Sequence, residues 1–313
     1  MWRAIGNFYL VKNGRSITPT VIFLKREKKM KRKLKIAILM LSVAALLLSL
    51  SACGDKNTSD LSAVQEAGVL RVGMECNYAP FNWTQATESE SAVALSGGGY
   101  ADGYDVQIAL QLAEKLGVEL EIVKLEWEGL VPALESNKID TIIAGMSPTD
   151  ERKVSIDFSN PYYTSELVMV VMADGAYSEA EAISDFSGAK ITGQLSTCNY
   201  TVIDQIEGVV KQTAMSDFPA MIVALQGGKI EGYVAELPAA MSAVEGNSDL
   251  KFIRFAEGNG FTASEAEVSV SVGLRKGSDL ADSLNSALEL IVAKDREELM
   301  DWAIANQPLS EAN

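Results

Sequence analysis

The sequence predicts an α/β protein of two similar lobes, each a mainly parallel sheet with flanking helices. Strand-like apolar segments alternate with amphipathic helical segments along the chain, which is typical of βαβ units around a parallel sheet. A twelve-residue segment of the first half also has a similar counterpart in the second half. The 313 residues, 48% of them hydrophobic, are enough for two ordinary domains with cores of their own.

The first half opens with a strand over residues 69–74, followed by an amphipathic helix over residues 104–116. Gly117 is suited to the left-handed conformation that ends a helix. The further elements predicted here are a strand at 118–125, a short helix at 129–136 and a strand at 139–144. The glycine-rich run 96–99 lacks the Lys-Ser/Thr of a phosphate loop, and it is predicted to lie in a hairpin-like insertion.

A helix is expected to begin at Ser147, because Ser is a good cap and the following Pro148 has no amide hydrogen to lose. Arg152 then falls within the first turns. The free amides of a helix start favour an anion, and an arginine adds a fork for a carboxylate. The segment 142–152 therefore has two compatible interpretations, an ordinary helix start and a carboxylate site.

The internal repeat aligns residues 133–144 with residues 224–235, at an offset of 91. Ala, Leu, Lys, Ile and Ala are identical in the two phrases. Upstream of them, Trp127 falls opposite Phe218. Ligands of open α/β sheets bind at the carboxyl ends of strands. In this alignment those ends are Ala144-Gly145 and Ala235-Glu236, and two such edges facing each other form a cleft.

The last elements are a strand over residues 267–274 and a helical segment over residues 280–304. We expect both to return to the first lobe.

Composition excludes several kinds of site. The chain has no histidine, which removes Ser-His-Asp and Cys-His nucleophiles and histidine-containing zinc sites. We expect no metal and no cofactor. Residues 53–313 carry 16 Lys or Arg against 41 Asp or Glu, a net −25, which argues against nucleic acid as a partner. Cys76 and Cys198 have no paired spacing, and we expect free thiols.

The N-terminal region has the pattern of a secretion signal. Residues 30–52 are a basic stretch and an apolar run, ending in the lipobox-like Leu50-Ser51-Ala52-Cys53. We expect cleavage before Cys53, lipidation of that cysteine, and a tether over residues 53–62. An uncleaved anchor with a chance cysteine is the alternative. Residues 1–29 do not fit a signal peptide and are interpreted as a mis-called upstream extension.

Short motifs along the mature chain resemble family 3 of the solute-binding proteins of ABC importers. The resemblance covers roughly residues 60–310. Its markers are the segments VGMECNYAPF at 72–81, GYDV at 103–106, WEGLVPAL at 127–134, IAGMSPTDER at 143–152, DFSNPYY at 157–163 and GLRKG at 273–277. Each motif is weak alone, and their order and spacing make the resemblance specific.

The resemblance implies a type II periplasmic-binding-protein-like fold, with the two lobes joined by a two-strand hinge. Residues 63–166 and 268–313 would form one lobe and residues 167–267 the other. The ligand would be a polar amino acid held between them.

The same resemblance implies which residues bind that ligand. Tyr78 and Trp127 would sandwich its side chain, and Glu236 would pair with its α-ammonium. Arg152, Ser147 and the backbone at Ala144 and Gly145 would hold its α-carboxylate and part of its α-ammonium. The loop residues Gln194, Thr197 and Cys198 would bind the same carboxylate. Three positions depart from the family pattern. Ser196 replaces a usual glycine, Cys198 a usual Thr or Ser, and Glu236 a frequent Asp.

Glu75 occupies a position that is often Asp in the family and can meet a cationic side chain. With Tyr78 and Trp127 beside it, arginine or lysine is the preferred ligand. The alternatives for Glu75 are a solvated loop residue and a carboxylate that binds a loop amide.

The expected function is therefore capture of an amino acid for an ABC permease and its ATPase subunits, by a monomer. The protein would be anchored by lipid on the extracytoplasmic face of a Gram-positive cell membrane and would not be an enzyme. A dehydratase-like enzyme on the same scaffold and an amino-acid sensor component are the competing hypotheses.

Overall fold

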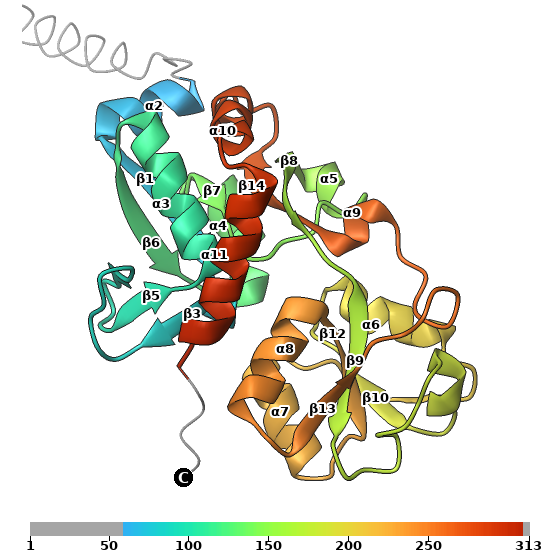
Figure 1. Ribbon diagram of the computed structural model, residues 1–313. Coiled ribbons are helices and arrows are strands. Elements are labelled where there is room, and N and C mark those ends of the chain that lie inside the picture. Colours follow the sequence, from blue (N-terminus) through green and yellow to red (C-terminus); the bar gives the residue numbers. More distant parts are fainter. Residues whose placement is uncertain (1–58, 309–313) are drawn as a thin grey trace, which may run out of the picture. The chain divides into compact units, whose positions relative to one another are not determined.

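Residues 59–308 are described by the computed structural model, and they contain two five-stranded sheets with flanking helices (Figure 1). The predicted extension, the signal peptide, Cys53 and the first part of the tether lie outside the described residues.

The sheet of the first lobe has the strand order β6-β1-β7-β14-β8. Strand β1 is parallel to β6 and to β7, whereas β14 is antiparallel to both β7 and β8. The bounds are β1 Val69–Met74, β6 Glu119–Lys124, β7 Thr141–Ile142, β8 Ile156–Thr164 and β14 Ser269–Arg275.

The sheet of the second lobe repeats this pattern in the order β11-β10-β12-β9-β13. Strand β10 is parallel to β11 and β12, and β9 is antiparallel to β12 and β13. The bounds are β9 Leu167–Met172, β10 Lys190–Thr192, β11 Val210–Lys211, β12 Gly232–Glu236 and β13 Leu250–Ile253. The prediction of two α/β lobes of one type is confirmed. The sheets are mixed rather than mainly parallel, because each has two parallel and two antiparallel strand pairs.

Helices cover both sheets. They are α2 Asp60–Ala67, α3 Tyr104–Leu116, α4 Leu130–Glu135, α5 Arg152–Ser155, α6 Cys198–Thr201, α7 Phe218–Gln226, α8 Leu237–Gly246, α9 Glu265–Val268, α10 Leu280–Glu289 and α11 Ala293–Asn306. Three 3₁₀ turns are η1 Trp127–Gly129, η2 Ile183–Phe186 and η3 Val202–Gln205. Helix α3 has the predicted bounds and buries the apolar side chains Val106, Ile108 and Leu112.

A small third sheet confirms the predicted insertion. It has the order β2-β3-β5-β4, with β2 Asn77–Tyr78, β3 Asn82–Gln85, β4 Val93–Ala94 and β5 Tyr100–Asp102. Strands β4 and β5 are a hairpin around the glycine-rich run, closed by the Leu95 amide donating to the Gly99 carbonyl at 3.0 Å.

The internal repeat has the same hydrogen bonds in both lobes. After α4, the Lys138 amide donates to the carbonyl of Ala133 at 2.9 Å, and after α7 the Lys229 amide donates to Ala224 at 2.9 Å. The acidic residue that follows receives a backbone amide in each case: Asp140 accepts from Arg71, and Glu231 accepts from Lys190. The sequence match therefore reflects one local structure used twice.

Two chain crossings connect the lobes. The first runs from β8 into β9, and the second returns through α9 into β14 (Figure 1). The crossings are bonded to each other, since the Ser165 amide donates to the Val268 carbonyl at 2.8 Å.

Helix α11 contacts α3 of the first lobe and α8 of the second. Just beyond its end, the buried Gln307 amide donates to the Ser242 carbonyl at 3.1 Å.

Four predicted boundaries are wrong. Residues 60–62 belong to α2 rather than to a tether, because Ser59 caps that helix and Asp60 pairs with Arg275 at 2.8 Å. The segment 280–304 is two helices, since Arg296 bonds the carbonyls of Leu288 and Ile291 and ends α10.

The strand predicted over 139–144 is reduced to β7, because the amides of residues 138 and 139 bond to the end of α4. The strand predicted from residue 267 begins at residue 269, after α9.

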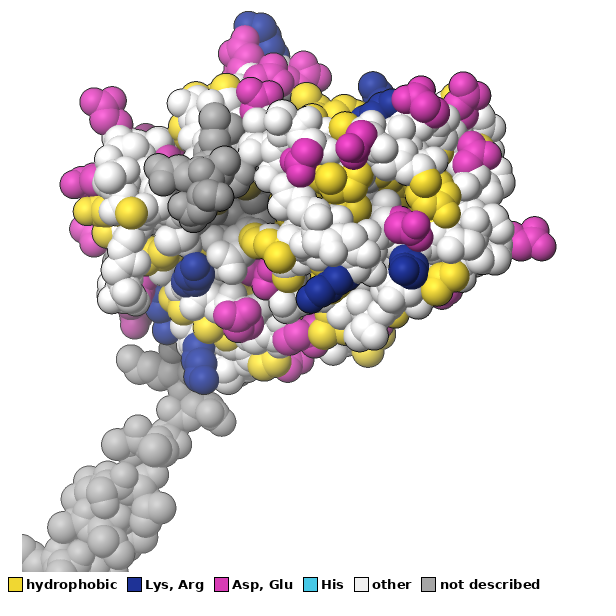
Figure 2. All heavy atoms as spheres, turned by 90° about the horizontal axis from the view of Figure 1, so that it is seen from below, with side chains coloured by type: hydrophobic (Ala, Val, Ile, Leu, Met, Phe, Trp, Pro, Cys, Tyr) yellow, Lys and Arg dark blue, Asp and Glu magenta, His cyan; other side chains and the backbone are white. Residues whose placement is uncertain are grey.

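Acidic side chains are spread over the face seen in Figure 2, interspersed with Lys and Arg. None of the helices within residues 59–308 combines the length and the apolar character needed to cross a membrane.

Candidate functional site

The candidate site lies where strand ends of the two lobes face each other. Ten of the eleven predicted residues line one cavity, together with Asn199, which the sequence analysis did not select. The lining residues are Tyr78, Trp127, Ala144, Gly145, Ser147, Arg152, Gln194, Thr197, Cys198, Asn199 and Glu236. They follow the carboxyl ends of strands β1, β6, β7, β10 and β12, the edge where open α/β sheets bind ligands. The eleventh residue, Glu75, is not among the lining residues, but it contacts one of them, Gln194.

Arg152 connects the lobes at one side of this cavity. Its guanidinium donates to the carbonyl of Ser147 at 2.9 Å and, across the cleft, to the carbonyl of Ser196 at 2.9 Å. It also lies over the Trp127 ring, 5.1 Å from the centroid. Burial lowers the pKa of Arg152. The guanidinium nevertheless stays cationic, because the ordinary pKa of an arginine is far above neutral pH. A half-buried cation whose partners here are carbonyls and a ring can form a stronger, charge-assisted pair with a carboxylate.

The predicted helix start at Ser147 is wrong. Helix α5 begins five residues later, and the Ser147 hydroxyl donates instead to the carbonyl of Glu267 at 3.1 Å. Because this four-residue helix begins at Arg152 itself, the residues before Arg152 do not provide the free helix amides that the predicted anion site requires. The carboxylate hypothesis therefore rests on the guanidinium rather than on a helix dipole.

Glu236 supplies the opposite charge. It is 7% exposed, and it accepts hydrogen bonds from the Tyr78 hydroxyl of the first lobe and from the Asn199 amide at 3.1 Å. These donors orient one carboxylate oxygen. Asn199 was missed because its neighbour Cys198 carried the family pattern, and a single asparagine after a loop has no signal of its own.

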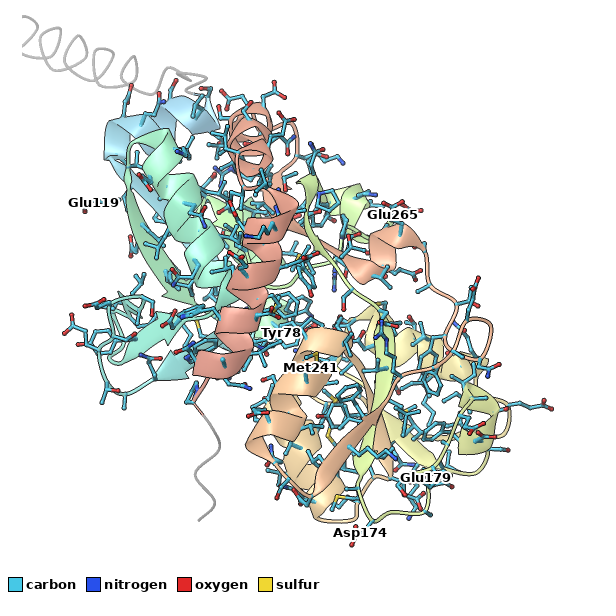
Figure 3. The ribbon with its side chains drawn as sticks, in the orientation of Figure 1. Tyr78, Glu119, Asp174, Glu179, Met241 and Glu265 are labelled. Atoms are coloured by element: carbon cyan, nitrogen blue, oxygen red, sulfur yellow. The ribbon has the colours of Figure 1, made fainter. Side chains whose placement is uncertain are left out.

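Tyr78 lies at the junction of the two lobes (Figure 3). Its ring stacks on Phe81, with centroids 5.0 Å apart, and on Phe218 of the second lobe at 4.6 Å. Gly145 has φ +61°, and a Cβ there would stand 2.6 Å from the Tyr78 ring, so the glycine allows both the turn and the close approach. Each of the predicted sandwich partners already contacts another side chain of the protein. The Tyr78 ring contacts Phe218, and the Trp127 ring contacts the Arg152 guanidinium.

Glu75 is buried rather than solvated, with 4% of its surface exposed. Its carboxylate accepts from the Gln194 amide at 3.2 and 3.3 Å, across the cleft. Burial raises the pKa of Glu75 to about 7, and the neighbouring carboxylates of Asp217 and Glu126 add to that rise. Of the alternatives, a solvated loop residue is excluded. A buried carboxylate in acidic surroundings would gain from a cation.

The remaining loop residues are fixed by local hydrogen bonds. The Thr197 hydroxyl donates to the Gln194 carbonyl at 2.8 Å, and the Cys198 thiol donates to Glu267 at 3.3 Å. Cys76 and Cys198 are free thiols, as predicted, and burial raises the pKa of each to about 12. Ser196 has φ +56°, the left-handed conformation that the usual glycine would adopt more easily.

Asp105 is a buried carboxyl that connects segments of the site through hydrogen bonds. It accepts from Asn82 and from the Tyr162 hydroxyl, both at 2.7 Å, and from the Gly145 amide. Asn82 in turn accepts from the Cys76 amide at 2.7 Å. One buried carboxyl thus connects the Glu75–Tyr78 loop to the Gly145 turn, and burial raises its pKa to about 7.

The arrangement suits binding of a zwitterion. A half-buried cation, Arg152, and a buried anion, Glu236, line the same cavity. Within residues 59–308, no group of three or more His, Cys, Asp or Glu side chains is placed to hold a metal.

Comparison with known proteins gives one family. Residues 70–301 match the model described as bacterial extracellular solute-binding proteins, family 3. The chain is 27% identical over 257 residues to the arginine-binding extracellular protein of Bacillus subtilis, covering 80% of this chain and 91% of that protein. It is 30% identical over 255 residues to the L-cystine-binding protein of Escherichia coli, covering 80% and 88%.

A solved structure has the same fold. It is an amino acid ABC transporter substrate-binding protein from Streptococcus pneumoniae bound to L-arginine. The TM-score is 0.69 at 25% identity, and the match covers 79% of this chain and 98% of that one.

Proposed function

The chain belongs to the family 3 bacterial extracellular solute-binding proteins, which are binding proteins rather than enzymes, and on that premise we propose that it captures a cationic amino acid for an ABC importer. The observation that carries the proposal is a pair of opposite charges, the half-buried Arg152 and the buried Glu236, lining one cavity between the lobes. They match the carboxylate and ammonium of an α-amino acid.

Arg152 would exchange its two carbonyl acceptors for the ligand α-carboxylate, a stronger, charge-assisted and bidentate partner. Glu236 would receive the α-ammonium, which replaces the Tyr78 hydroxyl on its carboxylate. Ser147, Thr197, Cys198 and the backbone at Ala144 and Gly145 would complete the polar lining.

The preference for arginine or lysine rests on Glu75. Its carboxylate is buried, and the side chain that donates to it within residues 59–308 is the neutral Gln194 amide. A ligand cation near it would replace a weak partner by a charged one. One of the similar proteins compared above is named for arginine, and the solved structure is bound to L-arginine, which supports the same choice.

We further propose that residues 63–166 with 268–313 move as one lobe against residues 167–267, about the paired crossings at Ser165 and Val268. Closure would enclose the ligand, and the monomer would then deliver it to the permease and its ATPase subunits.

Cys53 would carry the lipid that holds the protein on the extracytoplasmic face of the membrane. Comparing wild type with Cys53→Ser tests this, since the variant should leave the membrane fraction. A variant that stays fully membrane-bound would contradict the lipid anchor.

A thermal-shift screen of the twenty amino acids tests the function. A ligand that binds only the folded state raises its stability by about 2.7 kcal/mol at one hundred times Kd. We expect arginine or lysine to raise the melting temperature most, with no consumption of the ligand. No shift with any of the twenty would contradict the proposal.

A further inference from the structure

A second and larger hollow adjoins the inner cavity that Arg152 and Glu236 line. This outer groove has a volume of about 660 Å³, which lies within the roughly 300–1,000 Å³ of small-molecule pockets. Both lobes contribute to it. The residues that line the outer groove but not the inner cavity include Val131, Met146 and Ser155 of the first lobe and Tyr200, Thr201 and Ala266 of the second.

The two hollows join at the carboxylate end of the proposed ligand. Four residues line both of them: Trp127, Arg152, Thr197 and Cys198. Of the two charged groups proposed to bind the ligand, Arg152 is therefore shared, whereas Glu236 lines the inner cavity alone. An amino acid with its ammonium at Glu236 and its carboxylate at Arg152 thus presents its carboxyl end to the outer groove. A longer ligand can extend out of the inner cavity in that direction.

The outer groove is acidic. Among the residues that the structure describes, its lining contains four carboxylates, Glu128, Asp150, Glu151 and Glu267, and one cation, Arg152. A cleft lined mainly by charges of one sign concentrates groups of the opposite sign. The extension that fits this groove is therefore one that carries a positive charge, in addition to a carboxylate for Arg152.

We propose that the protein also binds dipeptides of basic residues, with the N-terminal residue in the inner cavity and a second lysine or arginine in the outer groove. This inference rests on the proposed function. The free ammonium of the dipeptide would meet Glu236, as that of an amino acid would, and the second side chain would lie among the carboxylates. The terminal carboxylate is displaced by one residue, about 3.5 Å. Arg152 lines both hollows, so a change of its side-chain rotamer is enough to follow that carboxylate.

Calorimetric titration of the purified protein with L-arginine, arginyl-lysine and arginyl-glutamate tests the proposal. Arginyl-lysine should bind within about tenfold of arginine, and about tenfold more tightly than arginyl-glutamate. Because the acidic side chains of Glu128 and Glu151 are exposed, added salt should reduce the difference between the two dipeptides.

Ala266→Trp separates the amino acid from the dipeptide, because Ala266 lines the outer groove and not the inner cavity. The larger side chain should fill the groove and weaken arginyl-lysine binding by more than about tenfold, while arginine binding changes by less than about twofold. Ala63→Trp is the matched control, an exposed helical alanine of α2 that lines neither hollow, and it should change neither affinity.

A pair of charge variants tests the acidic lining. Glu128→Gln combined with Glu151→Gln should remove the preference for arginyl-lysine over arginyl-glutamate. Glu88→Gln combined with Glu90→Gln removes the same charge from exposed positions outside the groove, and it should leave that preference intact.

A wild-type protein that binds arginine but not arginyl-lysine would overturn the inference and leave the proposed function standing. So would an Ala266→Trp variant that keeps arginyl-lysine binding, or that loses both ligands equally. If Ala266→Trp does not fold, an unchanged dipeptide preference in the Glu128→Gln, Glu151→Gln protein would equally overturn the inference. A wild type that binds neither arginine nor arginyl-lysine would contradict the proposed function as well.

Discussion

At the residue scale, the site consists of charges whose partners come from the opposite lobe. Arg152 donates to Ser196, Tyr78 donates to Glu236, and Gln194 donates to Glu75. Family motifs located the three charged residues. Their partners could not be predicted, because each contact joins residues at least 44 positions apart and depends on how the lobes face each other.

Glu75 should make stability depend on pH. Its folded pKa of about 7 lies above the ordinary 4.5, so the folded state holds the proton more tightly than the unfolded state. The charged form therefore costs stability as pH rises from 4.5 to 7, by about 3 kcal/mol at most. Glu75→Gln should be more stable than wild type at pH 8, and the difference should vanish as pH falls toward 4.5.

Denaturant unfolding of both proteins from pH 4.5 to 8 checks this. Glu119→Gln is the control, since Glu119 is exposed and points away from the protein (Figure 3), and its effect should be small and flat. A Glu75→Gln difference that does not change with pH would show that the carboxyl is not the titrating group.

At the element scale, local signals predicted which elements form better than where they end. Helix α3 has the predicted bounds because periodicity and a glycine C-cap agree. Ser147 has every feature of a helix cap, but its hydroxyl bonds the distant Glu267 carbonyl instead. A contact 120 residues away thus overrides the local preference.

The repeat also fixes a backbone conformation twice. After α4 and α7 the chain turns through a left-handed residue, Asn137 with φ +59° and Gly228 with φ +65°. Gly228→Ala should cost about 1 kcal/mol, because a Cβ is disfavoured there even though the space around it is open. Gly228→Asn should cost less, since the first lobe uses asparagine at this position.

Thermal unfolding of these variants measures the difference. Gly97→Ala is the control, a surface glycine with open space and no positive φ, and it should be neutral or slightly stabilising. A Gly228→Ala variant as stable as wild type would show that the turn relaxes.

At the scale of the whole molecule, the internal match between residues 133–144 and 224–235 was sufficient to predict two lobes of one type. It also predicted the edges that face each other, because strand ends in such sheets gather ligand-binding groups. The internal match did not predict which side chains make contact between the lobes. The stacking of Tyr78 on Phe218 is the clearest example of such a contact.

The central claim is that Arg152 receives the ligand α-carboxylate, and the most direct test is calorimetric titration with L-arginine and L-argininamide, whose carboxylate is replaced by a neutral amide. Arg152→Ala should weaken arginine binding about 100-fold, since a buried charge pair is worth roughly 2–5 kcal/mol when one partner is removed. It should hardly change the already weak binding of argininamide. An Arg152→Ala protein that binds arginine as tightly as wild type, or loses both ligands equally, would contradict the account.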